Sequence, residues 1–298
     1  MASIYGFILL GYIAKHIFKD QLDQKSFILL SLYFLQPILT FWGLTRTPIN
    51  SDLVQTPFYY FIIITITLAL LLLVAKFAVK DSKQRSIFIA ASLIGNTGNL
   101  GIPLGIALFG EASVAYTSII NIANVFFIYT TGIYFFAKDK FNLIQSLQSM
   151  FKIPILWFAI AAIIFNIFEI PIHDNIDKVL QMGAYATIVI QLIIFGMYLH
   201  EIKLKTINYA LGIKVSIAKH LLLPTVGLAI IVNTNLDAMV ASILIIQLMV
   251  PLAVNTVNIA ALYDCKPHDM TASILISTIV FIFMIYFYLQ IIQYFLGA

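Results

Sequence analysis

Apolar runs of about 20 residues recur along the whole chain, and only short polar links separate them. Each run is long enough to cross the hydrocarbon core of a bilayer, which is about 30 Å thick. A water-soluble surface needs more charge than this chain offers, because 10% of its residues are charged and 61% are hydrophobic. The sequence therefore predicts an all-α integral membrane protein in which no separate soluble domain is present.

Ten transmembrane helices are predicted, near residues 3–18, 26–44, 57–79, 86–109, 113–137, 153–168, 179–199, 210–232, 237–262 and 270–296. The first run is interpreted as a spanning helix rather than a signal peptide, because its lysines, Lys15 and Lys19, follow it instead of preceding it. The longest link, from Lys138 to Lys152, is polar and divides the chain into two repeats, residues 1–140 and 150–298. Since each repeat has five helices, the second must enter the membrane with opposite orientation, and two inverted five-helix repeats are expected.

Basic residues are distributed unequally between the two sides of the predicted membrane. Links after odd-numbered spans carry Lys19, Lys25, Lys80, Lys83, Arg85, Lys138, Lys140, Lys152, Lys203, Lys205 and Lys266, whereas links after even-numbered spans carry Arg46 and Lys178. The positive-inside rule places the odd links in the cytoplasm and both termini outside. We therefore expect a multi-pass protein of the cell inner membrane. The lone Cys265 excludes an internal disulfide.

The pattern Asn-Thr-x-Asn occurs twice, once in each half, and each copy lies inside an apolar span beside a proline. The first copy runs from Asn96 to Asn99 and is followed by Pro103; the second runs from Asn255 to Asn258 and is preceded by Pro251. The glycines of the first stretch, which include Gly98 and Gly101, also oppose a regular helix. Two such interruptions in corresponding spans are typical of a transporter binding site built from broken helices.

A broken helix exposes backbone N–H groups at the start of its second half, where the partial positive charge of the helix end can hold an anion. Asn96 and Asn99 add side-chain donors and acceptors on one side. The alternative is a structural kink that neighbouring helices satisfy. This alternative is stronger for the second interruption taken alone, because that stretch has a proline but no glycine.

Few ionisable residues lie within the spans. Lys219 and His220 lie inside span 8. One interpretation is that Lys219 extends to the cytoplasmic surface. The other is that Lys219 or His220 faces the binding site, as the counter-charge of an anion or as a proton carrier. Asn121 and Asn124 of span 5 either reach the site or bond across helices. Apart from Asp237 at the first position of span 9, neither broken helix contains Asp or Glu, although Na⁺ could use the oxygens of Gln247, Asn255 and Asn258. No histidine pair has metal-ligand spacing, so neither a metal nor a cofactor is expected.

These motifs resemble the auxin efflux carrier family, which includes plant auxin exporters and bacterial malonate and malate permeases. The resemblance covers nearly the whole chain and is strongest from Gly95 to Gly110, with Pro251, Asn255 and Asn258 matching a second signature. It implies a ten-helix inverted-repeat fold related to the bile acid/sodium symporters. In that fold helices 1, 2, 6 and 7 form a scaffold, helices 3–5 and 8–10 form a transport domain, and the broken helices 4 and 9 cross.

The resemblance further implies a substrate site at the crossing, lined by Asn96, Asn99, Pro103, Pro251, Asn255 and Asn258, an elevator-like movement, and a homodimer through the scaffold. The function expected is secondary transport of small organic anions, either auxin-like or malonate- and malate-like, by alternating access, with H⁺ or Na⁺ as the possible coupling ion. A sodium-coupled symporter and a channel remain as alternatives. An enzyme is not expected, because the chain has no Gly-x-Ser-x-Gly or His-Glu-x-x-His motif. Thinly spread lysines give no support to nucleic-acid binding.

Overall fold

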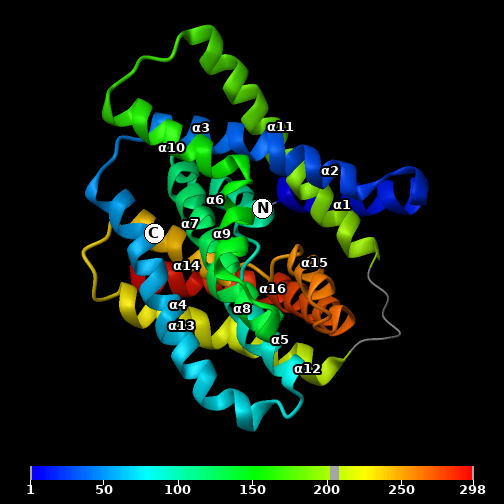
Figure 1. Cartoon of the computed structure of the whole chain (residues 1–298). Helices are drawn as coiled ribbons and strands as arrows, with labels where there is room; N and C mark the ends of the chain where they lie inside the picture. Colours follow the sequence, from blue (N-terminus) through cyan, green and yellow to red (C-terminus); the bar gives the residue numbers. More distant parts are fainter. Residues whose placement is uncertain (1, 202–207, 297–298) are drawn as a thin grey trace.

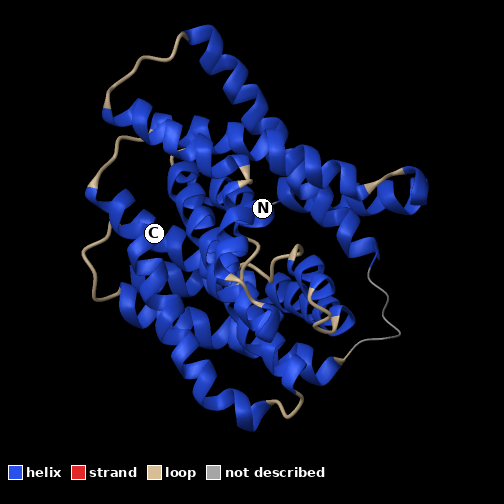
Figure 2. Ribbon diagram, viewed as in Figure 1, coloured by secondary structure: helices blue, strands red, loops and turns tan. Residues whose placement is uncertain are grey.

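The computed structural model describes residues 2–201 and 208–296 of the 298-residue chain, so Lys203 and Lys205 of the charge count lie outside it. Regular structure in the described part is helical (Figures 1 and 2). The first half contains α1 (Ala2–Phe18), α2 (Gln24–Leu30), α3 (Gln36–Arg46), α4 (Ser51–Ala78), α5 (Ser82–Leu93), α6 (Ile102–Phe109), α7 (Ser113–Phe127) and α8 (Ile133–Ala137). The second contains α9 (Leu143–Phe151), α10 (Pro154–Ile167), α11 (Asp174–Glu201), α12 (Tyr209–Ile217), α13 (Leu223–Ile231), α14 (Ala238–Met249), α15 (Thr256–Leu262) and α16 (Pro267–Leu296).

Six continuous stretches in the described residues are long and apolar enough to cross a membrane, and a seventh arises if the bent pair α9–α10 is one span. The six are Gln24–Arg46, Ser51–Ala78, Ser113–Lys140, Asp174–His200, Tyr209–Ile231 and Pro267–Leu296. The prediction of an all-helical, multi-pass membrane protein is thus confirmed. The two spans that carry the Asn-Thr-x-Asn motifs are missing from this count because each is interrupted, which leaves the shorter apolar helices Thr97–Phe109 and Ala238–Met249.

The link between Lys138 and Lys152 is more ordered than the sequence reading expected. It holds α9, which meets α10 at an angle of 64°. Leu143, Leu147 and Met150 recur at helical spacing along this segment, and Met150 is buried against Ile155 at the start of α10. Ser146 and Met150 are buried on one face of this helix, whereas Leu143 and Ile144 are exposed, so the link is a packed helix instead of an irregular loop.

Wide, π-helical turns interrupt four segments: η2 (Ser31–Leu35), η3 (Thr97–Gly101), η4 (Ile128–Gly132) and η7 (Ala218–Leu222). Three of them end two residues before a proline, namely Pro37, Pro103 and Pro224. A proline inside a helix lacks the N–H donor and its ring clashes with the carbonyl of the preceding turn, and a wider turn accommodates both effects. The same residue type therefore shapes the backbone of three separate spans near their polar residues.

All the helices except α9, which contacts both η4 and α10, fall into two groups (Figure 1). In the first helix group, which comprises α1, α2, α3, α10 and α11, α1 packs along α11 and α3 packs against both α10 and α11. Gly11 and Gly196 allow the close approach of α1 and α11, since a Cβ on Gly196 would lie 1.9 Å from the backbone oxygen of Ile8. In the second helix group, which comprises α4 to α8 and α12 to α16, α12 packs along α16 and α4 packs against α7 and α13.

An apolar contact joins the two groups next to the first interrupted span. Leu39 and Trp42 of α3 are buried with Ile102 of α6, Val114 of α7 and Ala184 of α11. α11 also lies directly against the π-helical turn η3. The first helix group therefore covers one side of the interruption, and the second group supplies its other neighbours.

Candidate functional site

The first interrupted span changes direction at Ile94–Asn96. α5 ends at Leu93, and the chain re-enters a helical conformation only at Thr97. The carbonyl oxygen of Asn96 accepts hydrogen bonds from the N–H groups of Leu100 (3.2 Å) and Gly101 (3.0 Å), which starts the second half-helix. The first N–H groups of η3 have no acceptor within the helix, because it provides no carbonyl oxygen before them. This end of η3 therefore carries partial positive charge.

The second interrupted span is broken at Val250–Asn255. α14 ends at Met249, and α15 starts at Thr256, whose hydroxyl donates to the carbonyl of Ala253. Pro251 lies at the centre of this break, which explains why one proline without glycine suffices to end the helix here. Both motifs thus mark real interruptions rather than kinks in continuous helices.

The two interruptions meet at the centre of the molecule and pair through their backbones. The N–H of Asn96 donates to the carbonyl of Pro251 (2.8 Å), and the N–H of Ala253 donates to the carbonyl of Ile94 (3.2 Å), so that Gly95 and Leu252 form an antiparallel bridge. In Figure 2 these stretches are the loops enclosed by helices. Non-helical backbone at membrane depth needs such partners, because lipid offers none. The pairing thus fixes two half-helix ends beside each other.

A small polar cavity, which we call the central cavity, opens against this crossing. Its volume is about 100 Å³, and its polar lining comes from Gln36, Asn96, Asn99, Asn121, Asn124 and Asn255. None of the residues that line it is charged. The Nδ2 atom of Asn96 is buried without a partner, and Gln36 donates from Nε2 to Oδ1 of Asn99 at 3.3 Å. Buried amide groups that remain partly unpaired are suited to bind a polar solute.

A larger cavity, the vestibule, adjoins the central cavity and shares Ile28, Leu32 and Asn255 with it. Its volume is about 880 Å³, and Asn258, Tyr33 and Tyr129 contribute to its walls. Lys15 and Lys25 lie in the same wall with Asp23, so the vestibule leads toward the link between α1 and α2. A solute could therefore reach Asn255 from this end of the molecule.

Asn121 and Asn124 of α7 hold the first interruption in place. Asn124 donates from Nδ2 to the carbonyl of Gly95 (2.9 Å) and to the hydroxyl of Thr97 (3.0 Å), and its Oδ1 accepts from the hydroxyl of Tyr60 (3.0 Å). The hydroxyl of Thr97 donates to Oδ1 of Asn121 (2.8 Å). Both asparagines line the central cavity and also form hydrogen bonds to other helices. The two interpretations of these residues therefore do not exclude each other.

Replacing Asn124 by alanine should destabilise the crossing, because the carbonyl of Gly95 and the hydroxyls of Thr97 and Tyr60 would lose a buried partner. We expect a loss of about 3 kcal/mol, from unsatisfied groups that each cost about 1 to 3 kcal/mol. The measurement is the thermal midpoint of the purified protein in detergent. Ser118→Ala is the matched control, because Ser118 lies on the same helix, is fully buried, and its hydroxyl has no hydrogen-bond partner. Equal midpoints for the two variants would contradict the assigned network.

Lys219, His220 and Gln247 lie close to the crossing but are not among the residues that line the central cavity. A Cβ placed on Gly95 would lie 2.9 Å from Nζ of Lys219, and one placed on Gly101 would lie 2.2 Å from Oε1 of Gln247. His220 pairs through Nε2 with the hydroxyl of Ser277 (2.9 Å), which also accepts from the N–H of Leu252 (3.2 Å). His220 thus supports the second interruption through Ser277.

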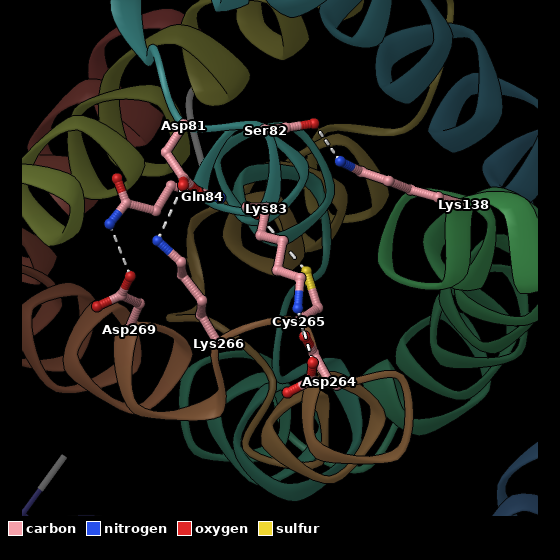
Figure 3. A network of polar contacts seen from close by, with 9 residues as sticks. All are labelled: Asp81, Ser82, Lys83, Gln84, Lys138, Asp264, Cys265, Lys266 and Asp269. Carbon is pink, nitrogen blue, oxygen red and sulfur yellow. Dashed lines mark hydrogen bonds and ion pairs between the residues drawn. The ribbon is translucent and has the colours of Figure 1, made fainter.

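Salt bridges and hydrogen bonds connect the links of the second helix group at one end of the molecule (Figure 3). Lys83 pairs with Asp264 (2.7 Å) and Lys266 pairs with Asp81 (3.1 Å), while Gln84 donates to Asp269 (2.8 Å). The hydrogen bond from Lys83 and its charge hold the pKa of Asp264 below its usual value, and the N–H of Gln84 lowers the pKa of Asp81. This stabilisation is present above the ordinary Asp pKa and is lost as acidification protonates both carboxylates.

Six of the residues that the sequence indicated, Asn96, Gly98, Asn99, Asn121, Asn124 and Asn255, line the central cavity, and Asn258 lines the vestibule. Gly101, Pro103 and Pro251 shape the half-helices, whereas Lys219, His220 and Gln247 lie behind them. Sequence reasoning missed Gln36 and Thr97. An amide next to Pro37 within an apolar span was the available signal for Gln36, and Thr97 is part of the repeated motif itself.

The chain is similar in sequence to known membrane proteins. A family model described as "Membrane transport protein" matches residues 1–289. An uncharacterized transporter, MJ1031, of Methanocaldococcus jannaschii is 26% identical over 284 residues, which cover 91% of each chain.

Proposed function

Because the chain belongs to the membrane transport protein family, whose members include the auxin efflux carriers, we propose that it is a secondary transporter of small organic anions. The observation that carries the proposal is the backbone pairing of the two interrupted spans beside a cavity lined by carboxamides. Half-helix ends and amides bind a solute without enclosing it permanently, and the cavity communicates with a vestibule on one side. That arrangement suits alternating access better than a continuous pore.

An anionic solute fits the charges around the crossing. The starts of η3 and α15 carry partial positive charge and lie at the interruptions, where Asn255 lines both cavities. The central cavity has no acidic residue in its wall that would attract a cation. The vestibule wall holds two lysines, Lys15 and Lys25, against one carboxylate, Asp23, and this net positive charge adds an attraction for anions that approach from that end. Mono- and dicarboxylates of the auxin, malonate and malate types are therefore the solutes we propose.

The interruptions also support a ten-span topology of two inverted repeats. Counting α1, α2–α3, α4, α5–α6, α7–α8, α9–α10, α11, α12–α13, α14–α15 and α16 as one crossing each gives five crossings before and five after residue 140. The interrupted crossing is then the fourth of each repeat. In this topology both termini lie outside the inner membrane and the vestibule opens to the cytoplasm, as the distribution of lysines indicates.

Transport in this proposal moves the second helix group, as a transport domain, against the first, as a scaffold. The polar network of Figure 3 and the hydrogen bonds of Asn124 join helices of the second group to one another, which favours movement as one body. A second copy of the chain would pair through the scaffold helices and keep them stationary in the bilayer. The crossing would then carry its solute between the two sides, as in an elevator.

Counterflow in proteoliposomes tests the function. Vesicles preloaded with unlabelled malonate, malate or indole-3-acetate should take up the same labelled compound faster than empty vesicles, and a channel should show no such acceleration. Each assay is run in sodium chloride and in choline chloride, so that a sodium-coupled symporter is distinguished from a sodium-independent carrier. Absence of counterflow for every carboxylate, with folded protein in the vesicles, would contradict the proposal.

A further inference from the structure

Lys219 places an ammonium group in the interior of the second helix group. The residue lies in the π-helical turn η7 and is 1% exposed, which makes it one of the largest fully buried side chains of the protein. Its helix neighbour Lys214, one turn and a half earlier, is exposed and donates to the carbonyl of Ala78 (2.8 Å). Lys219 therefore does not extend to the surface, which answers the alternative left open by its sequence position.

No acidic side chain of the described residues pairs with Lys219. Ion pairs of the described residues that join Arg46 to Glu111 and Asp177, Lys83 to Asp264, and Lys266 to Asp81 all lie at the ends of helices and do not include Lys219. An isolated charge in a protein interior is costly, because it loses its hydration. A lysine in this position keeps its charge only where other groups with partial negative charge lie close to it.

The carbonyl ends of two half-helices lie near Nζ of Lys219. A Cβ on Gly95 would lie 2.9 Å from Nζ of Lys219 and 3.5 Å from the carbonyl oxygen of Gln247, so both atoms flank one point at the crossing. α5 and α14 both end here, at Leu93 and Met249, and the last carbonyls of a helix carry partial negative charge. Both side-chain polar atoms of Gln247 are buried without partners, and they lie against Gly101 of the first interrupted span. These oxygens are the kind of ligand that holds a coupling cation in transporters with broken helices.

We propose that the Lys219 ammonium is the cation of the transport site and stands where a coupling Na⁺ would otherwise bind. This inference rests on the proposed function and adds to it that solute transport requires no Na⁺. Gly95 is the residue that makes the arrangement possible, because a side chain at this position would occupy the space of Nζ. Gly95 also lines the central cavity, so one short backbone segment adjoins both the ammonium and the cavity in which an anion would bind.

The test combines salt dependence with substitution of Lys219, in the full-length protein in proteoliposomes and with malonate, malate and indole-3-acetate as labelled probes. Wild-type counterflow should be equal in sodium chloride and choline chloride. Lys219→Met should lower it at least about tenfold in both salts, since an interior unit charge alters the binding of an opposite charge by that order. Lys219→Ala leaves space at the carbonyl ends, so Na⁺ or methylammonium should raise its thermal midpoint and partly restore counterflow.

Lys214→Ala is the matched control, because it removes an exposed lysine from the same helix and should behave as the wild type. Wild-type counterflow that depends on Na⁺ would overturn the inference and leave the proposed function intact, whereas absence of counterflow in every salt would contradict the proposed function. Unchanged counterflow of Lys219→Met, or a Lys219→Ala protein that responds to neither cation, would also overturn the inference. If a variant does not fold, the wild-type salt comparison still decides.

Discussion

Replacing either Asn99 or Asn255 by alanine is expected to reduce carboxylate counterflow to near background without unfolding the protein. Asn99 is partly buried in the wall of the central cavity, and Asn255 is exposed to both the central cavity and the vestibule. A hydrogen bond between an amide donor and a charged ligand contributes about 1.5 to 3 kcal/mol, so each substitution should weaken solute binding by about 10- to 100-fold.

Stability should change little in both variants, because neither side chain holds the crossing together. Asn99 accepts one long hydrogen bond from Gln36, at 3.3 Å, and the crossing itself is joined through backbone atoms. The thermal midpoint in detergent measures this, and Asn233→Ala is a suitable control because Asn233 lies at the exposed end of α13. Wild-type counterflow in both site variants would remove these asparagines from the proposed mechanism.

The positions of both interruptions could be predicted from local sequence, because glycine and proline act on the backbone within one or two turns. Gly95 to Pro103 and Pro251 to Asn258 lie where α5 and α14 end and the next half-helices begin. The predicted spans also agree with the helical segments to within several residues. These features depend on neighbours in the chain, which a sequence displays directly.

The pairing of Gly95 with Leu252 could only be inferred by analogy, because it joins backbone atoms far apart in the chain. The same reason explains why Gln36 was missed: its partner Asn99 lies on another helix group. The π-helical turns before Pro37 and Pro224 were also not predicted, since a proline permits either a kink or a widened turn and packing selects between them. The part of the site that could not be predicted from the local sequence is therefore determined by contacts between residues far apart in the chain.

A disulfide between the two helix groups should stop transport completely and reversibly. Gly43 of α3 and Val114 of α7 face each other across the contact between the groups, and a Cβ on Gly43 would lie 3.0 Å from Cβ of Val114. Paired cysteines have Cβ atoms about 3.5 to 4.5 Å apart, so a shift of less than about 1 Å allows the bond in a Gly43→Cys/Val114→Cys protein. Movement of the second helix group against the first would then be prevented.

The experiment uses a Cys265→Ser background, since the native cysteine is buried at the far end beside Lys83 (Figure 3). Oxidation of the double-cysteine protein should abolish malonate, malate or indole-3-acetate counterflow, and reduction should restore it. The reduced protein is its own control for packing changes, because the same two side chains are present in both states. Neither substitution touches the central cavity, so the loss would report on movement and not on solute binding. Cross-linked protein that still exchanges solute at the reduced rate would show that α3 and α7 keep their contact throughout the cycle, and a moving transport domain would then have to be abandoned.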